Sequence, residues 1–278
     1  MQRNAIVVIR GGGDLGTGVA HRLARSHYRV AVLETARPRV VRRAAALAQA
    51  VPDGDTIVEG VIGRRSKIED LPALLAAGRD DAAAPGPVVP VAVDPEGRAI
   101  ELLRPDAIVD ARMAKRNLGT SSGAAVTIGL GPGFVAGSDV DFVIETKRGN
   151  GMGRLIEKGA AESDTGIPGE VAGIAEERLI RSPAAGRFEA TCAIGDVVAA
   201  GAVVGRVAGS PVAARIDGLL RGLIADGTDV ENGEKIGDVD PRGSSIDPTA
   251  ISDKARSMGG AVLEALLSRG ILPAGADD

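Results

Sequence analysis

A 32-residue repeat in the second half of the chain restricts its fold more than any other feature of the sequence. Short apolar runs separated by Gly-Asp and Asn-Gly turns surround the repeated positions, a pattern typical of short antiparallel strands. Two β units that each bury one face against the other explain such a repeat. The matching positions are Gly186, Gly195, Val198, Gly201, Gly205 and Val207, which recur as Gly218, Gly227, Val230, Gly233, Gly237 and Val239.

The spacing of this repeat resembles the barrel-sandwich hybrid, or hammerhead, of biotinyl and lipoyl carrier domains over residues 180–240. Those carriers place a modified lysine in the hairpin where their two halves meet. Here the corresponding join, residues 208–212, reads Ala-Gly-Ser-Pro-Val and contains no lysine. We therefore do not expect a carrier function, and we interpret the module as structural or as a docking surface.

The first half of the chain alternates strand-like and helix-like segments. Residues 5–9 form an apolar run that ends in glycines, as a strand buried on both faces of a parallel sheet does. Residues 14–25 have the apolar spacing of a helix, and further strands are expected at 30–34, 56–58, 88–93, 107–109, 126–128 and 142–144. This order predicts an α/β fold: a Rossmann-like, mostly parallel sheet with a second, β-rich barrel-sandwich-hybrid (hammerhead-like) module.

The same pattern divides the chain into three parts. Residues 1–150 are predicted to form the Rossmann-like α/β domain, and residues 151–247 the β-rich module with its repeat core at 180–240. Residues 248–278 are expected to contain a C-terminal helix that packs back on the rest.

Composition excludes several classes of partner. With three Phe, one Tyr and no Trp, the chain has almost no rings on which bases could stack, and its net charge of −4 disfavours polyanions. We expect no nucleic-acid partner. No apolar run approaches the roughly 18 residues of a membrane span, and the N-terminus shows no secretory signal, so we expect no membrane contact and a cytoplasmic location.

Metal-binding and basic residues are unevenly distributed. Cys192, His21 and His27 cannot assemble a Cys/His zinc site, so no metal site is predicted, although a site made of carboxylates alone stays open. The first fifty residues carry nine Arg against only Asp14 and Glu34. This excess indicates either an anion site or arginines on solvated helix faces.

The first glycine-rich loop follows the first strand and opens the first helix. Gly11, Gly13 and Gly16 fit the G-x-G-x-x-G pattern, and Glu34 ends the next strand. In such a loop the backbone can approach a diphosphate at a helix N-terminus, while the acidic residue binds a ribose diol. Glu34 would favour NAD over NADP, whereas Arg37 keeps NADP open.

Two residues depart from the usual dinucleotide loop. Arg10 ends the strand where an apolar residue is usual, and Asp14 places a carboxylate close to the expected phosphates. We therefore expect the fold more firmly than NAD itself. The cofactor is left unidentified, with a nucleotide or pterin dinucleotide preferred over NAD.

Other polar residues are expected at the same edge of the sheet, because they follow later strands. Arg112, Lys115 and Arg116 would share one face of a helical turn and clamp an anion, unless they form a solvated basic turn. Gly131 and Gly133 form either a ligand loop or a turn that needs positive φ, and Phe134 is the only aromatic placed to meet a ligand ring. The predicted cofactor-binding residues are Gly11, Gly13, Asp14, Gly16, Glu34, Arg112, Lys115, Arg116, Asn117, Gly131, Gly133, Phe134, Glu145 and Arg148, and no catalytic residue is assigned.

Several blocks together resemble the YqeB-type family, the accessory proteins of selenium-dependent molybdenum hydroxylase systems. The resemblance implies a maturation or assembly factor whose partner is an apo molybdenum hydroxylase of the xanthine dehydrogenase type. In that pattern a His often stands at Asn150 and a Cys near Asp247, so a thiol relay of selenium through this chain is not expected. The blocks are residues 9–15, 109–117, 129–134, 139–148, 237–242 and 251–256.

The sequence thus predicts a maturation factor that binds a nucleotide or nucleotide-like cofactor. Two alternatives stay open: an NAD(P)-dependent oxidoreductase, which lacks an evident proton donor in the crevice, and a non-catalytic scaffold or adaptor. The sequence also leaves open the client, the oligomeric state, a homo-oligomer included, and whether any reaction is catalysed.

Overall fold

The computed structural model describes residues 5–77, 85–120, 123–163 and 169–273. The chain divides into two compact units. Unit 1 comprises Met1–Pro38, Ala46–Asp164 and Ile251–Asp278, and unit 2 comprises Arg39–Ala45 and Thr165–Ala250. Residues 151–164, which the sequence pattern assigned to the β-rich module, are therefore part of unit 1, and residues 39–45 are part of unit 2.

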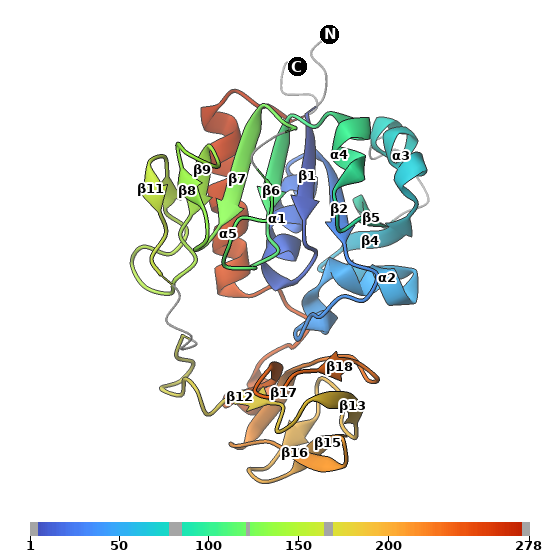
Figure 1. Cartoon of the computed structure of the whole chain (residues 1–278), viewed down its shortest axis with the longest axis vertical. Coiled ribbons are helices and arrows are strands. Elements are labelled where there is room, and N and C mark those ends of the chain that lie inside the picture. Colours follow the sequence, from blue (N-terminus) through green and yellow to red (C-terminus); the bar gives the residue numbers. More distant parts are fainter. Residues whose placement is uncertain (1–4, 78–84, 121–122, 164–168, 274–278) are drawn as a thin grey trace. The chain divides into compact units, whose positions relative to one another are not determined.

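Unit 1 is built around a nine-stranded sheet (Figure 1). The seven central strands run parallel to one another, and β10 and β3 pair antiparallel at the two edges. The predicted α/β architecture with a mostly parallel sheet is confirmed. The spatial order is β10 (Leu155–Ile156), β9 (Phe142–Ile144), β7 (Val126–Leu130), β6 (Ala107–Asp110), β1 (Ile6–Arg10), β2 (Arg29–Glu34), β5 (Val88–Val93), β4 (Val61–Ser66) and β3 (Asp55–Val58).

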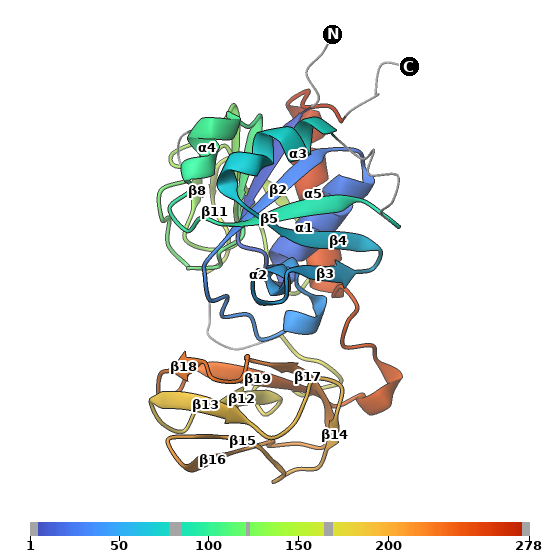
Figure 2. The same cartoon turned by 90° about the vertical axis from the view of Figure 1, so that its right-hand side faces the viewer.

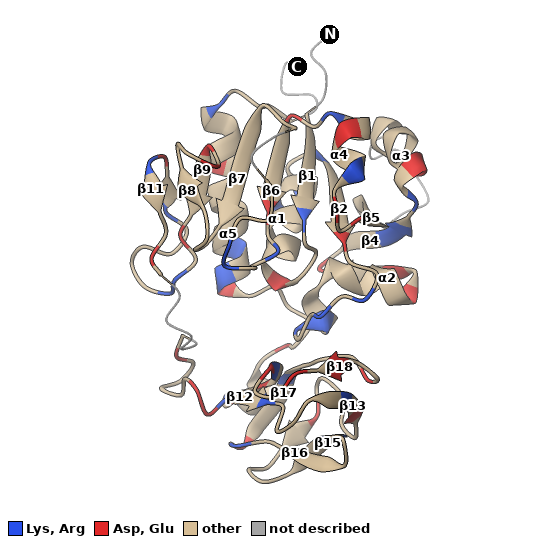
Figure 3. Cartoon of the chain, viewed as in Figure 1, with Lys and Arg blue, Asp and Glu red and all other residues tan. Residues whose placement is uncertain are grey.

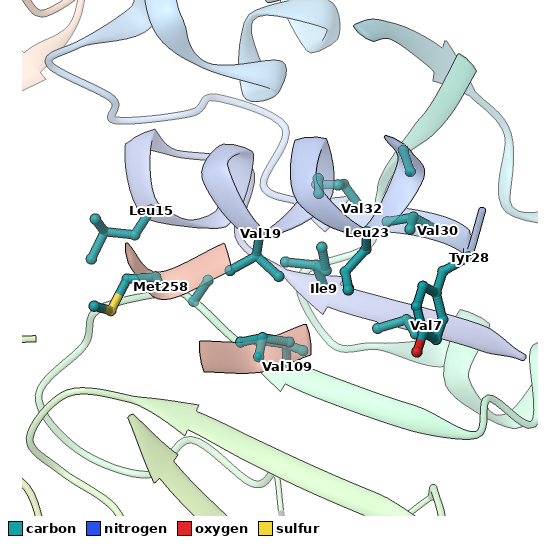
Figure 4. Close-up of a cluster of buried hydrophobic side chains, with 14 of the residues drawn as sticks. Val7, Ile9, Leu15, Val19, Leu23, Tyr28, Val30, Val32, Val109 and Met258 are labelled. Carbon is teal, nitrogen blue, oxygen red and sulfur yellow. The ribbon is translucent and has the colours of Figure 1, made fainter. Parts of the chain in front are cut away.

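Helices cover this sheet. Val7 and Ile9 of β1 pack with Val19 and Leu23 of α1 and with Met258 of α5 in one aliphatic core (Figure 4). The helix expected at residues 14–25 is α1 (Asp14–Arg25), and α5 (Asp253–Ser268) packs beside it. The shorter helices are α2 (Ala50–Asp53), α3 (Leu71–Ala77) and α4 (Arg98–Leu103), and a two-stranded sheet pairs β8 (Val135–Ala136) with β11 (Gly159–Ala160).

Unit 2 consists of two four-stranded antiparallel sheets (Figure 2). One has the order β12 (Leu179–Arg181), β19 (Lys235–Asp240), β17 (Gly218–Leu223) and β14 (Val197–Val198). The other has the order β16 (Ser210–Ala213), β15 (Val203–Val207), β13 (Gly186–Ala190) and β18 (Asp229–Val230).

The two copies of the 32-residue repeat build both of these sheets together. The strands β12 to β15 recur as β16 to β19, and each sheet contains two strands from each repeat. Val198 pairs with Gly218, and the equivalent Val230 pairs with Gly186. Backbone hydrogen bonds repeat in the same way: Gly195 N–H donates to Leu220 O at 2.9 Å, and Gly227 N–H donates to Phe188 O at 2.8 Å. Phe188 and Leu220 are both fully buried at equivalent positions.

Arginines attach residues 39–45 to the rest of unit 2. The Arg39 guanidinium contacts the Glu234 carboxylate and donates to Asp229 O at 2.8 Å. Arg42 donates to Ala250 O at 2.8 Å, and Arg43 donates to Leu223 O at 3.1 Å. These members of the N-terminal arginine excess thus bind a carboxylate and carbonyl oxygens within unit 2.

In the part of the chain that the structure describes, no helix combines the length and the apolar character needed to cross a membrane.

Candidate functional site

The loops that follow β1, β6 and β7 lie side by side at the carboxyl edge of the sheet. In the strand register Arg10 is opposite Asp110, and Asp110 is opposite Gly129. A Cβ added at Gly11 would lie 3.0 Å from the Ala111 carbonyl, and one at Gly133 would lie 2.4 Å from the backbone of Lys115 and Arg116. The structure therefore brings together the two glycine loops and the basic segment that the sequence singled out.

This edge includes the point where the order of the strands reverses. The chain leaves β1 toward β2 on one side, and it returns later to place β6 on the other side. In open α/β sheets the loops diverge at such a point and leave a crevice where ligands bind. The first glycine loop and the Asp110–Arg112 segment follow these two strands.

The first glycine loop is held by Glu34. Gly11 has a φ of 99°, and a Cβ at Gly16 would lie 2.0 Å from Gly11 O, so both positions require glycine. The Glu34 carboxylate accepts hydrogen bonds from Gly12 N–H at 2.9 Å and from Thr35 N–H at 2.7 Å. Glu34 thus orders the loop through an N–H that could otherwise face a phosphate.

Asp14 adds a second negative charge to this loop. It is the first residue of α1, directly after the N-cap residue Gly13, where the helix dipole favours an anion. The hydroxyl of Ser252, which caps α5 by accepting from Ala255 N–H at 3.1 Å, lies 3.3 Å from the Asp14 carboxylate. Part of the positive potential at the N-terminus of α1 is therefore already offset by the protein itself.

Asp110 organises the charged residues after β6. Its buried carboxylate accepts hydrogen bonds from the Arg112 guanidinium, the Thr120 hydroxyl and, at 3.1 Å, the Arg112 backbone N–H. Arg112 also donates to Thr120 Oγ1 at 3.1 Å. Arg112 keeps 19% of its side chain exposed, so it is an oriented cation rather than a mobile one.

Arg10 is the residue whose role the sequence did not predict. It is 5% exposed, and its guanidinium donates to Pro95 O at 2.9 Å and to Gly119 O at 3.2 Å, which ties two loops across the end of β1. Burial lowers the pKa of Arg10 and the charge of Arg112 lowers it further, whereas Asp110 and Asp94 raise it. Figure 3 shows the two signs of charge at this end of the sheet, blue at the end of β1 and red at the end of β6. A charged residue at the end of a buried strand was the only signal of this role.

The segment after Arg112 differs from the helical turn that the sequence predicted. Met113 and Lys115 have positive φ values of 54° and 58°, and residues 111–120 contain no helix, so the three cations do not share a helical face. Lys115 and Arg116 are exposed. Asn117 has a structural role, because its side chain accepts from Gly119 N–H at 2.9 Å and donates to Asp139 at 3.2 Å.

The second glycine loop has the geometry of a turn that needs positive φ, which the sequence left open as the alternative to a ligand loop. Gly131 and Gly133 have φ values of 77° and 106°, and a Cβ at Gly131 would lie 2.6 Å from the Thr146 hydroxyl. The expectation that Phe134 meets a ligand ring is wrong, because the ring is 4% exposed and packs on Gly129. Its neighbours in this small core are Ala136, Val140, Val143, Ile156 and Ala161.

Glu145 and Arg148 hold the backbone around β9. The Glu145 carboxylate is 1% exposed and accepts from the backbone N–H groups of Lys147 and Glu162 at 2.7 and 2.8 Å. Arg148 forms an ion pair with Asp253, with one contact of 2.7 Å, at the first turn of α5. Both side chains thus have partners within unit 1. Within the described ranges, no three His, Cys, Asp or Glu side chains are grouped so that they could hold a metal ion.

One curated protein is closely similar to the chain. It is 45% identical over 263 residues, which cover 94% of this chain, to the Escherichia coli K12 protein named "Uncharacterized protein YqeB". The predicted resemblance to YqeB-type proteins is confirmed. The chain spans about half the length of this YqeB relative, 47% of it, and the relative's name states no activity. No family model matches the sequence.

Similarity to solved structures is weak. An aspartoacylase family protein from Mesorhizobium loti is 14% identical, with a TM-score of 0.26 and 85% of each chain covered. A succinylglutamate desuccinylase/aspartoacylase from Rhodobacter sphaeroides is also 14% identical, with a TM-score of 0.25 and the same coverage. Scores this low do not establish a common fold.

Proposed function

We propose that this YqeB-type chain is an accessory protein that binds a nucleotide or nucleotide-like cofactor, such as a pterin dinucleotide, during maturation of a molybdenum hydroxylase of the xanthine dehydrogenase type. The apo hydroxylase would be its partner. The observation that carries the ligand-binding part is the close approach of the loops after β1, β6 and β7 at the β1/β6 reversal. The client enzyme comes from the family resemblance alone.

We also propose a fold class for each of the two units. We assign unit 1 to the Rossmann-like class, because β1 opens a glycine loop and α1 and the strand order reverses beside it. We assign unit 2 to the barrel-sandwich hybrids, because its repeats exchange the short strands β14 and β18. A docking role fits unit 2 better than a carrier role, because the turn between β15 and β16 contains no lysine.

The charges at the site indicate how a ligand would be oriented. Lys115 and Arg116 are exposed beside the partly exposed Arg112, and they suit phosphate or carboxylate groups. Glu34 and Asp14 suit hydroxyl or amino groups, which a ribose, a purine or a pterin would supply. The ligand that fits is therefore one with both anionic groups and hydrogen-bond donors.

The test is a panel of NAD, NADP, ATP, CTP and molybdopterin dinucleotides, scored by the shift in the thermal unfolding temperature. A ligand at about 100 times its dissociation constant stabilises the folded chain by about 2.7 kcal/mol. We expect the double variant Lys115→Ala/Arg116→Ala to bind the stabilising ligand at least about tenfold more weakly, a loss of about 1.4 kcal/mol. The matched control is Arg65→Ala, an exposed arginine on β4.

Two outcomes would replace the proposal. Stabilisation by NAD together with hydride-transfer turnover would favour the oxidoreductase. No stabilisation by any member of the panel would favour a scaffold without a cofactor.

A further inference from the structure

The repeat in unit 2 allows one face of the fold to be compared with its own equivalent. Val198 and Val230 occupy matching inward positions, and both are buried. The other positions around them differ: where the second repeat has Asp229, Glu231, Asn232, Glu234 and Lys235, the first repeat has Val197, Ala199, Ala200, Ala202 and Val203. We call the last five residues the valine patch.

The valine patch lies on the surface. Val197 is 68% exposed and Val203 is 41% exposed, although valine is among the residues most often buried. Ala199 and Ala200 are exposed, whereas Ala202 is half-buried at the border of the patch, where it also packs against the core of unit 2. The patch is one continuous stretch of chain, from β14 through a turn into β15, and its five side chains carry no charge.

The fold does not require apolar residues at these positions. Val197 pairs with Leu219 in the same register in which Asp229 pairs with Arg187. The backbone of the second repeat thus makes the same strand pairs with charged side chains on its outward face. The apolar side chains of the first repeat are therefore explained by a contact outside this fold rather than by folding.

The equivalent face of the second repeat is itself a docking face. Arg39 contacts the Glu234 carboxylate and donates to Asp229 O at 2.8 Å, both within unit 2. Where the Glu234 carboxylate receives a cation in the second repeat, the first repeat has Ala202. The valine patch thus has no carboxylate at the position that binds Arg39 in the second repeat.

We propose that the valine patch is the contact between two copies of this chain, each patch packing on the other across a twofold axis. A twofold contact needs a surface complementary to itself, and an uncharged patch satisfies this where Asp229, Glu231 and Glu234 would repel their own copies. The chain as a whole carries a net charge of −4, which disfavours self-contact through its charged faces. The strand β14 is also the edge of its sheet, so its outer side has no neighbouring strand there.

The contact is expected to be weak. Five small side chains form a patch below the roughly 800 Å² per partner of a standard interface. We expect a dissociation constant between about 1 μM and about 1 mM.

Sedimentation velocity from about 0.5 μM to about 1 mM tests this range. The wild-type sedimentation coefficient should rise with concentration. The variant Val197→Asp/Val203→Lys installs the residues that the second repeat has at these positions, so it should fold, and its dissociation constant should rise at least about tenfold. The control Leu267→Gln replaces an apolar residue of α5 whose exposure, 47%, lies between those of Val203 and Val197, and it should dimerise like wild type.

The single cysteine gives a second readout. Cys192 is half-buried, and its sulfur lies 3.8 Å from Val203 O, at the border of the patch. Its rate of reaction with a thiol reagent should fall as the wild-type concentration rises, and it should be constant for the double variant. A wild-type chain that stays monomeric overturns the proposal and leaves the patch to a different partner. A dimer that the double variant retains, or one that leaves Cys192 unprotected, overturns the assignment of the contact to the patch.

Discussion

At the scale of single residues, the charges of the candidate site are mostly bound to one another. Asp110 accepts from Arg112 and Thr120, and the Gly12 N–H donates to Glu34. A ligand therefore meets an ordered set of charges, which lowers the entropy cost of binding. Asp110 has the central position, because its buried carboxylate compensates two neighbouring guanidinium groups, those of Arg112 and Arg10.

Replacing Asp110 by Asn tests this central position. The variant keeps the shape of the side chain but removes a charge on a side chain that is 3% exposed, so it leaves Arg112 without its ion-pair partner and Arg10 with only Asp94 to offset its charge. Breaking a buried ion pair from one side costs about 3 kcal/mol, and we expect a loss of that size in the free energy of unfolding. Urea unfolding monitored by circular dichroism measures it.

The control for this substitution is Glu101→Gln, an exposed carboxylate on α4. We expect it to change the unfolding free energy by less than about 0.5 kcal/mol. If Asp110→Asn were as mild as the control, Asp110 would not organise the site.

At the scale of elements, glycines allow the backbones of α1 and α5 to approach each other closely. A Cβ at Gly18 would lie 2.3 Å from Ala255 O, and one at Gly259 would lie 2.6 Å from Gly18 O. Each helix thus has a glycine where the backbone of the other approaches. The close approach of α1 and α5 therefore requires glycine at these two positions.

The pair Gly18→Ala and Gly260→Ala separates packing from helix propensity. Both substitutions gain up to about 1 kcal/mol of propensity. Only Gly18 faces the backbone of another helix, because Gly260 is exposed and a Cβ there meets nothing within 4 Å. We expect Gly260→Ala to raise the unfolding temperature and Gly18→Ala to lower it, by overpacking of about 1–3 kcal/mol. Equal shifts of one sign in the two variants would contradict the close approach of α1 and α5.

Elements with a periodic sequence were predictable, and those set by local backbone conformation were not. The apolar run of β1, the stripe of α1 and the repeat strands follow from side-chain spacing. The turn after Arg112 does not follow from side-chain spacing, because Met113 and Lys115 adopt left-handed backbone conformations that these residue types do not favour. Phe134 was misplaced for a related reason: the positive φ of Gly133 precedes a ring that packs back on Gly129.

At the scale of the whole molecule, the chain passes between the two units more than once. Residues 39–45 leave the sequence of unit 1 to join unit 2, and the chain returns to unit 1 from Ile251. Contacts of this kind join residues far apart in sequence, such as Arg39 and Glu234. No local pattern in the first fifty residues specifies a partner near residue 234, so the sequence could not assign Arg39 to Glu234.

Replacing Arg39 by Ala tests whether residues 39–45 are an integral part of unit 2. The pair is partly exposed, 48% for the Arg39 side chain and 25% for Glu234, so we expect its loss to cost about 1 kcal/mol. Amide hydrogen exchange should speed up in β18 and β19 and stay unchanged in β1 and β6. The control Arg37→Ala removes an exposed arginine of unit 1 and should leave β18 and β19 unchanged.

The same pair predicts how the difference between wild type and Arg39→Ala depends on pH. Burial raises the pKa of Glu234, but the hydrogen bond and charge of Arg39, with the Glu231 N–H, outweigh it and hold the pKa below its ordinary value of 4.5. A carboxylate with a lowered pKa stabilises the folded state above its ordinary pKa, and this contribution is lost as pH falls through the folded value. The difference in unfolding free energy should therefore be complete at about pH 7 and nearly absent at about pH 2. A difference that persists unchanged in acid would mean that Arg39 acts through Asp229 O rather than through Glu234.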